Sequence, residues 1–594
     1  MQGTSAILAL FLIGLPGVAQ AQETNAGQDA AIVVRGLRDK PSSWRQAETD
    51  HVVVISDGSE KDLTRIAHNL ERLHFLLSVL LNRVDQPDIA VKLRVTLVGD
   101  TAEFDAMHLK NLRSSSGPYV AAFPFQRYYD PREDGPVMAA SRNDSRAILE
   151  QGTPLSAILP ALVSSVQGGG GPDTVAAADM PGMSVYLAGA GATFAQNDPL
   201  AIDVNGSTVP IPAESRIYAG FAQNWLLTYF PNAYPRWYVD GFGELFSTIA
   251  TQGDGSIEYG RAPAAYQKVM GRYLRMPLAD ILTGRYLAEK RTTERWTPYH
   301  AWALTHMLFF SNERKGQLHA YLATIAAGGS MEQAAAAFGD IGKLERELMA
   351  YDDHKLPYEQ MTYPADRAGE PSLRQLTQGE AAFVKGRLEL GARIDVPPAS
   401  DDPRLAQARR NAIAERDRWI EGVRKNAARY PANLQAQLLL AEAECRSGNG
   451  TECVAAAERA LAAAPGNSDA LAWKGSGLVL LALAASGADR ASMLKSARRT
   501  IAQANRADTE NPLPLLAFYR SYADAGEAAP DVAIEGLMKA ADAVPAAPGP
   551  RLLLGEALAK RGNLPAARKA LIPVANGAYD SPEAARARAL LATL

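Results

Sequence analysis

Two carboxylates stand four residues apart in the segment Trp237-Tyr-Val-Asp240-Gly-Phe-Gly-Glu244-Leu-Phe246. The pattern predicts two helices, 214–229 and 236–251, joined by a short turn that prolines bound. Asp240 and Glu244 would then share one face of the second helix. A carboxylate pair on one face can perform general acid–base chemistry. The same pair can instead be ordinary helix charge, which the dipole favours near a helix N-terminus.

The two predicted helices resemble the active-site helices of gluzincin-type zinc metallopeptidases. In that family the first helix carries H-E-x-x-H, which supplies two imidazole ligands and a general base. The second helix carries W-x-x-E-G-x-A-E-[YF]-F, whose first Glu completes the zinc site. Trp237–Phe246 matches the second motif, with Asp240 in place of the ligand Glu. Ala219–Gln223 stands where H-E-x-x-H would be, and that motif occurs nowhere in the chain.

The resemblance therefore implies a degenerate metallopeptidase-like domain with no zinc ligands, no catalytic residue and no cofactor. A vestigial cleft between the two helices would still hold an extended peptide. Its expected lining residues are Gln223, Asn224, Trp237, Asp240 and Glu244. The alternative is an active hydrolase or metallopeptidase with a non-standard site around Asp240 and Glu244.

Histidines offer no replacement site within one helix. His68 and His74 stand six residues apart, as do His300 and His306. Six residues on a regular helix leave two side chains splayed by about 120°, so neither pair can chelate one metal ion. We therefore expect no metal site.

The N-terminal elements that would position these residues are predicted to be strands alternating with helices. His51–Ser56 and Leu93–Val98 predict strands, and an apolar stripe between them predicts a helix over 60–82. From residue 214 onward helices dominate. We expect an α+β peptidase-like domain over 46–360, a small sheet followed by a helical subdomain. Residues 143–213 lie just before the first site helix, and their glycines suggest a cover for the cleft.

The C-terminal part, 405–594, is rich in alanine and entirely helical in pattern. Small residues recur in it, as in Leu554-Gly555, Gly562-Asn563 and Ala567. These positions resemble tetratricopeptide (TPR) repeats, helical hairpins of about 34 residues. Such arrays bind peptides or partner proteins in a concave groove, so we expect protein partners. The alternative is that the array only packs against the N-terminal domain. Residues 361–404, which include a Pro-rich stretch, are assigned to a linker.

The N-terminus indicates export. Residues 6–15 are apolar, Pro16 ends the run, and Ala19-Gln20-Ala21 fits signal peptidase, so 1–21 is predicted to be a signal peptide. The run is too short to span a bilayer. Residues 22–45 are assigned to a linker. These features predict a bacterial periplasmic or secreted protein. In such a compartment Cys445 and Cys453 could form a disulfide. The alternative is that both remain free, buried thiols.

The charge balance of the chain bears on one further class of function, nucleic-acid binding. The 594 residues include 61 Lys and Arg against 65 Asp and Glu, a net charge of −4. Without a basic excess, a nucleic-acid-binding role is not expected. The sequence therefore predicts an exported, catalytically inactive peptidase-like protein, a pseudoenzyme that binds peptides or proteins through its TPR array and vestigial cleft.

Overall fold

The computed structural model describes most of the chain beyond residue 38. The described residues are 39–84, 86–99, 103, 107, 109, 127–149, 192–194, 208–252, 254–263, 276–288, 298–351, 356–364, 367 and 369–594. The predicted signal peptide and most of the predicted cover, 143–213, lie outside them. Within these ranges, no helix is both long and apolar enough to cross a membrane.

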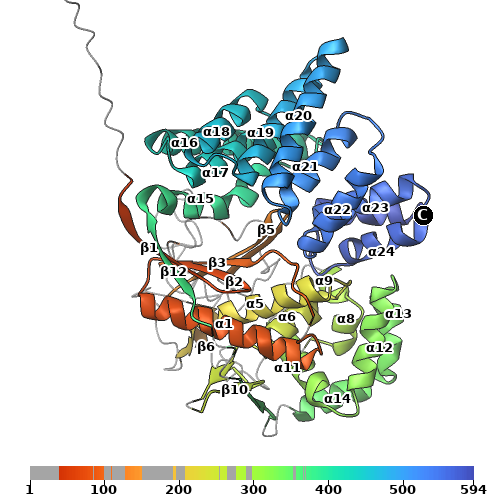
Figure 1. Cartoon of the computed structure of the whole chain (residues 1–594). Coiled ribbons are helices and arrows are strands. Elements are labelled where there is room, and N and C mark those ends of the chain that lie inside the picture. The colour runs from red at the N-terminus through yellow and green to blue at the C-terminus, as the bar shows by residue number, and fades with distance from the viewer. Residues whose placement is uncertain are drawn as a thin grey trace, which may run out of the picture. The chain divides into compact units, whose positions relative to one another are not determined.

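A six-stranded mixed sheet forms the centre of the N-terminal part (Figure 1). Its strand order is β12-β1-β2-β3-β5-β4, in which β2, β3 and β5 run parallel and the outer pairs are antiparallel. The strands are β1 (Pro41–Glu48), β2 (Val52–Ser56), β3 (Leu93–Val98), β4 (Arg127–Arg132), β5 (Gly135–Ser141) and β12 (Ser372–Thr377).

Helices cover both faces of this sheet. α1 (Glu60–Leu80) and α5 (Ala213–Tyr229) pack on one face, where their leucines and aromatic residues join those of β2 and β3 in one core. The hydroxyl of Ser59 caps α1 by accepting from the backbone of Asp62. α15 (Gln378–Ile394) covers the opposite face over Trp44, Val98 and Tyr128.

Both ranges assigned to linkers contain sheet strands or helices, which corrects that assignment. β1 begins at Pro41, inside 22–45, while β12 and α15 lie inside 361–404. The reason is non-local pairing: β1 forms its ladder with β12, so that Glu48 is opposite Ser372. β12 has its hydrogen-bond partner more than 300 residues away, and β1, which also pairs with the adjacent β2, is largely polar, so neither has a strong local signal.

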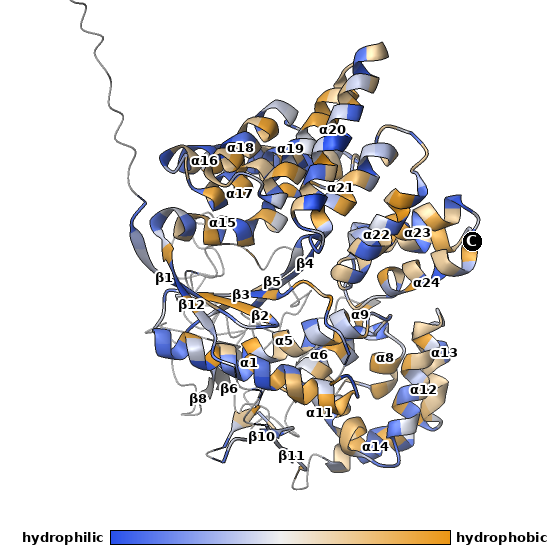
Figure 2. Ribbon diagram, viewed as in Figure 1, coloured by the Kyte–Doolittle hydropathy of each residue, from blue (hydrophilic) through white to orange (hydrophobic). Residues whose placement is uncertain are grey.

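Helices also form the subdomain that follows the sheet. α6 (Arg236–Leu245) packs on α11 (Pro298–Phe310), an apolar helix coloured orange in Figure 2. α6 ends earlier than the predicted residue 251 because 250–251 forms the short strand β9 (Ala250–Thr251). The other helices here are α8 (Leu278–Leu282), α9 (Arg285–Ala288), α12 (Lys315–Ala326), α13 (Met331–Ala335) and α14 (Ile341–Tyr351).

Two small sheets complete the N-terminal part. One has the order β11-β10-β9 and the other β7-β6-β8. Their remaining strands are β6 (Ser145–Leu149), β7 (Ala192–Phe194), β8 (Thr208–Ile211), β10 (Ser256–Tyr259) and β11 (Glu359–Thr362).

The C-terminal part is an array of helical hairpins, as predicted. Its helices are α16 (Pro403–Arg429), α17 (Leu434–Arg446), α18 (Gly450–Ala463), α19 (Ser468–Ala484), α20 (Gly487–Ala507), α21 (Pro512–Ala523), α22 (Asp531–Ala543), α23 (Pro548–Lys560), α24 (Leu564–Ala575) and α25 (Pro582–Leu591).

Small residues and one covalent link hold these hairpins together. A Cβ at Gly555 would lie 2.4 Å from Cγ of Leu571, so glycine permits α23 and α24 to pack closely. Cys445 and Cys453 form a disulfide that joins α17 to α18. The helical-repeat prediction is thus confirmed by the elements themselves.

Candidate functional site

The five residues predicted to line a vestigial cleft lie in the interior, on α5 and α6. Gln223, Asn224 and Trp237 are buried, Asp240 is 1% exposed and Glu244 is 6% exposed. The structure links Gln223, Asp240 and Glu244 through Arg127 of the edge strand β4, whereas the hydrogen bonds of Asn224 and Trp237 go to other neighbours.

Asp240 is held by two donors. Its Oδ2 accepts from Nε of Arg236 at 2.9 Å, and its Oδ1 accepts from Nε2 of Gln223 at 3.3 Å. Gln223 in turn accepts through Oε1 from Nη2 of Arg127 at 3.0 Å. Arg127 reaches the site from β4 and is itself buried. The carboxylate predicted to replace a zinc ligand therefore belongs to a buried ion-pair network.

Glu244 also lies close to Arg127, and it borders a cavity. Its Oε1 lies 3.6 Å from Nη1 of Arg127. Glu244 also borders a cavity of about 780 Å³ lined by Arg65, Tyr218 and Ser247, among other residues. Of the two predicted carboxylates, Glu244 is thus the one for which a neighbouring cavity is observed.

Asn224 and Trp237 connect these helices to their neighbours. The hydroxyl of Tyr129, on β4, donates to Oδ1 of Asn224 at 3.0 Å. Nε1 of Trp237 donates to the hydroxyl of Tyr321 at 3.2 Å, and that hydroxyl donates to the carbonyl of Leu282 at 2.8 Å. Both residues therefore fix the packing of α5 and α6.

The two glycines of the Trp237–Phe246 motif permit close helix packing. A Cβ at Gly241 would lie 2.0 Å from Oγ1 of Thr305 and 2.3 Å from the carbonyl oxygen of Ala301 on α11. A Cβ at Gly243 would lie 2.7 Å from the carbonyl oxygen of Ala219 on α5. A side chain at either position would overlap these neighbouring atoms, so α6 requires glycine at both positions.

The C-terminal array also reaches this network. The ring of Tyr579, between α24 and α25, lies 4.6 Å from Cζ of Arg236. Burial raises the pKa of the Tyr579 hydroxyl, and the charge of Asp240 raises it further. Burial also lowers the pKa of Arg236. The array therefore helps to enclose the residues that the sequence placed in an open cleft.

Sequence reasoning missed both arginines of this network. Arg236 stands four residues before Asp240, the spacing at which charged side chains pair on a helix. This ion pair could therefore have been predicted from the sequence. Arg127 lies on a strand about a hundred residues away, and no local signal connects it to Glu244.

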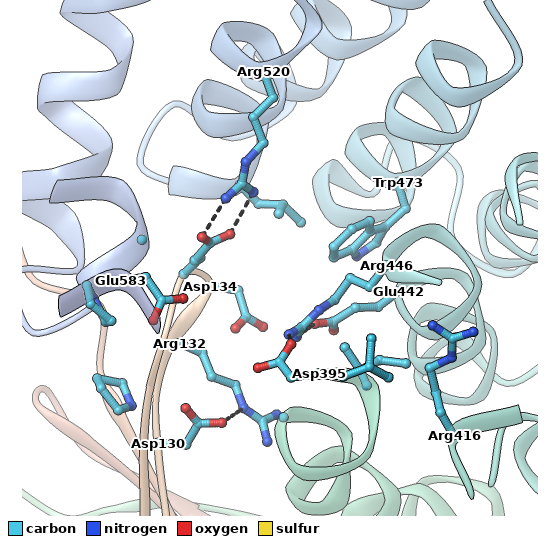
Figure 3. Close-up of a pocket in the computed structure, with 18 residues that line it drawn as sticks. Asp130, Arg132, Asp134, Asp395, Arg416, Glu442, Arg446, Trp473, Arg520 and Glu583 are labelled. Atoms are coloured by element: carbon cyan, nitrogen blue, oxygen red, sulfur yellow. Dashed lines mark hydrogen bonds and ion pairs between the residues drawn. The ribbon is translucent and has the colours of Figure 1, made fainter. Parts of the chain in front are cut away.

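A second site is a charged cavity of about 480 Å³ between the sheet and the array (Figure 3). The turn of the β4–β5 hairpin contributes Glu133 and Asp134, and the end of α15 contributes Asp395. Further lining residues come from the array: Arg416, Glu442, Arg446, Trp473, Leu513, Arg520, Pro548, Gly549 and Glu583.

The array residues of this charged cavity share one structural feature. Apart from Arg416, they belong to α17, α19, α21 and α23, the first helices of successive hairpins, and to α25, which follows these hairpins. We call these the facing helices. One side of the array is therefore turned toward the N-terminal part of its own chain, and the β4–β5 hairpin lies against it.

Ion pairs hold the hairpin there. Glu133 accepts from both terminal nitrogens of Arg520 on α21, at 2.6 and 2.7 Å (Figure 3). Asp134 pairs with Arg387 of α15, and Arg132 donates to the backbone carbonyl of Leu388.

We expect a modest coupling between Glu133 and Arg520. Both side chains are about one-third exposed, so a double-mutant cycle with Glu133→Gln and Arg520→Gln should give about 1 kcal/mol. Burial raises the pKa of Glu133, but Arg520 outweighs it and the net pKa is lowered. The coupling should therefore be complete above about pH 4.3 and fade as the pH falls through the lowered value.

Urea unfolding of the four proteins at pH 7 and at lower pH measures this coupling. The exposed pair Arg561 and Asp531, within the array, is a control that should show no measurable coupling. Equal coupling at both pairs would contradict a specific docking role for the hairpin.

One group of side chains in the described ranges could hold a metal ion. Ligand atoms of His51, His74 and Asp88 lie within 4.8 Å of one another. Burial lowers the pKa of His74 to about 3, and the charge of His51 adds to this effect, so His74 is neutral near pH 7. Sequence reasoning missed the group because its members come from a turn, from α1 and from the following loop.

No protein-family model matches the chain, and no curated protein matches it. The chain is similar to a solved structure, the crystal structure of a thermophilic TPR protein from Thermus thermophilus. The sequence identity is 21%, the match covers 31% of this chain and 92% of that chain, and the TM-score is 0.26.

Proposed function

We propose that this chain is an exported, non-catalytic protein-binding scaffold, in which a degenerate peptidase-like domain and a TPR-like array act together. One observation carries the proposal: the carboxylates at the predicted catalytic position are paired in the interior with arginines. A general base must reach a proton of its substrate. Asp240, at 1% exposure and bonded to Arg236 and Gln223, offers no such access.

The arrangement of α5 and α6 supports the peptidase-like part of the proposal. The resemblance requires the two helices to lie side by side next to the sheet. α5 packs against both α6 and β4, and Asp240 and Gln223 meet across the helix pair. Of the three positions that would bear zinc ligands in the family, one holds Ala219 and the other two hold Gln223 and Asp240, which are hydrogen-bonded to each other.

The charged cavity supports a binding role. Its six carboxylates exceed its four guanidinium groups, and Trp473 supplies an aromatic surface beside them. This composition favours a basic segment of a partner protein, since tryptophan is a frequent hot spot of interfaces and its ring attracts Lys and Arg cations. We therefore place the partner site at this cavity, between the β4–β5 hairpin and the facing helices.

Binding of immobilised 12-residue peptides to the full chain tests this assignment. We expect Lys- and Arg-containing peptides to bind, and Trp473→Leu to weaken that binding about tenfold or more. Trp419→Leu is the matched control, because Trp419 lies on α16, donates to Glu389 and does not line the cavity. Equal loss in both variants, or no preference for basic peptides, would argue against the cavity as the partner site.

Export is part of the same proposal. Residues 6–15 and 19–21 supply the apolar run and the cleavage pattern of a signal peptide, although residues 1–5 carry no Lys or Arg, and the Cys445–Cys453 disulfide suits an oxidising compartment. N-terminal sequencing of the mature protein from the periplasm should begin at Gln22. A mature protein that retains Met1 would contradict the assignment.

A second candidate, a hydrolase with a non-standard site, is favoured by one observation. Glu244 borders the cavity of about 780 Å³, so a substrate there could approach a carboxylate. Under this alternative, Glu244→Gln would abolish a cleavage activity.

A further inference from the structure

The strongest unassigned cluster in the described ranges lies at the start of β2. We define the His51 cluster as His51, His74, Asp88 and Glu71. His51 directly precedes β2, His74 and Glu71 lie on α1, and Asp88 lies in the loop between α1 and β3. None of these residues belongs to the Asp240–Glu244 network or lines the charged cavity.

Glu71 orients the ring of His51. One carboxylate oxygen lies 2.7 Å from Nδ1 of His51, and the other accepts from the backbone N–H of His51 at 3.0 Å. With Nδ1 donating to Glu71, the lone pair of a neutral His51 is on Nε2, which lies 3.6 Å from Oδ2 of Asp88. A carboxylate that fixes the far nitrogen in this way is the common support of metal-binding histidines.

His74 supplies a second nitrogen. Its side chain is buried, and its Nδ1 has no hydrogen-bond partner in the described part of the chain. A buried nitrogen without a partner destabilises the fold, and a ligand at this position would remove that cost. The ring stacks on that of His51, with centroids 3.6 Å apart. To share one ion, one of the two rings must turn out of this stack.

Asp88 supplies an oxygen and is itself held in place. The hydroxyl of Tyr229, at the end of α5, donates to its Oδ2. Arg83 is the nearby opposing charge, but its guanidinium lies 3.9 Å from the centre of the Tyr229 ring and donates to the carbonyl of Pro87. Two carboxylates therefore face the histidine pair, while this cation has other partners.

From this geometry we propose that the His51 cluster binds one Zn²⁺ ion, with His51, His74 and Asp88 as ligands and Glu71 as the support of His51. Two imidazoles and a carboxylate match the ligand preferences of zinc and leave a fourth position for water. The ion would tie together the turn before β2, α1 and the loop that precedes β3. This site is independent of the proposed binding function.

The test uses the tag-free full chain after treatment with EDTA, titrated with Zn²⁺ by calorimetry and with Co²⁺ by absorption spectroscopy. We expect one ion per chain and a tetrahedral Co²⁺ spectrum. His51→Gln and Asp88→Asn should each weaken binding at least tenfold, and Glu71→Gln should weaken it by about 10–100-fold. Circular dichroism shows whether each variant retains its fold.

His68→Gln is the matched control, because His68 lies on α1 outside the cluster and pairs with Glu370. It should bind Zn²⁺ as the unmodified chain does. The competing interpretation is that a protonated His51 bridges Glu71 and Asp88 without any metal. Absence of stoichiometric binding, or binding that survives both His51→Gln and Asp88→Asn, would overturn the proposal in favour of that ion pair.

Discussion

Gly241→Ala should destabilise the N-terminal part by about 3 kcal/mol or prevent its folding, because added volume in a packed interior is costly. The new methyl group would lie 2.0 Å from Thr305 Oγ1 and 2.3 Å from the carbonyl oxygen of Ala301. The second contact is with backbone, so a side-chain rotation cannot relieve it. α11 would have to move away from α6. Urea unfolding followed by tryptophan fluorescence measures the loss, since Trp237 and Trp302 lie on these two helices.

The matched control is Gly422→Ala. Gly422 lies within α16, is exposed, and has no atom within 4 Å of its added Cβ. Alanine there should be neutral or stabilise the array by about 0.5–1 kcal/mol. Similar effects at the two positions would contradict the account of the motif as a helix-packing element.

Arg127→Met should cost about 3–5 kcal/mol, the range for removing one partner of a buried ion pair. The substitution removes the cation 3.6 Å from Glu244 and the donor to Gln223. Because Arg127 and Glu244 are both largely buried, water cannot replace the lost interaction at low cost. The free energy of unfolding from urea titration is the measurement.

A rescue variant separates lost charge compensation from lost packing. Arg127→Met combined with Glu244→Gln should recover a large part of the stability, because the remaining carboxylate charge is gone. Arg142→Met is the control, since Arg142 is partly exposed and pairs with Asp57 nearer the surface. If the double variant were no more stable than Arg127→Met alone, charge compensation of Glu244 would not be the role of Arg127.

The sequence predicted the elements whose pattern is local. β3 was predicted at Leu93–Val98, as observed, and the helix predicted at 60–82 is α1. The hairpins of the array could be predicted because small residues recur at a similar, though not strict, spacing. β12 and α15 were not, because they are ordered by partners far away in the chain, and β1 was not, because its residues are largely polar although it pairs with the adjacent β2.

The candidate site shows the same limit. Asp240 and Glu244 were identified, but their burial was not, since exposure depends on Arg127 from β4 and on Tyr579 from the array. The concave groove expected on the array is a second case in which the exposure of a surface depends on distant parts of the chain. The facing helices lie against the β4–β5 hairpin of the same chain, a contact that no local pattern encodes.

Cleavage of unstructured peptides by the tag-free full chain, with and without added Zn²⁺, tests the central claim most directly. The claim is that Asp240 and Glu244 are structural. We expect no cleavage above that of buffer, and no change in Asp240→Asn or Glu244→Gln beyond their effect on stability. Cleavage that is abolished in folded Asp240→Asn and Glu244→Gln, and retained in His51→Gln, would contradict the account and establish the hydrolase alternative.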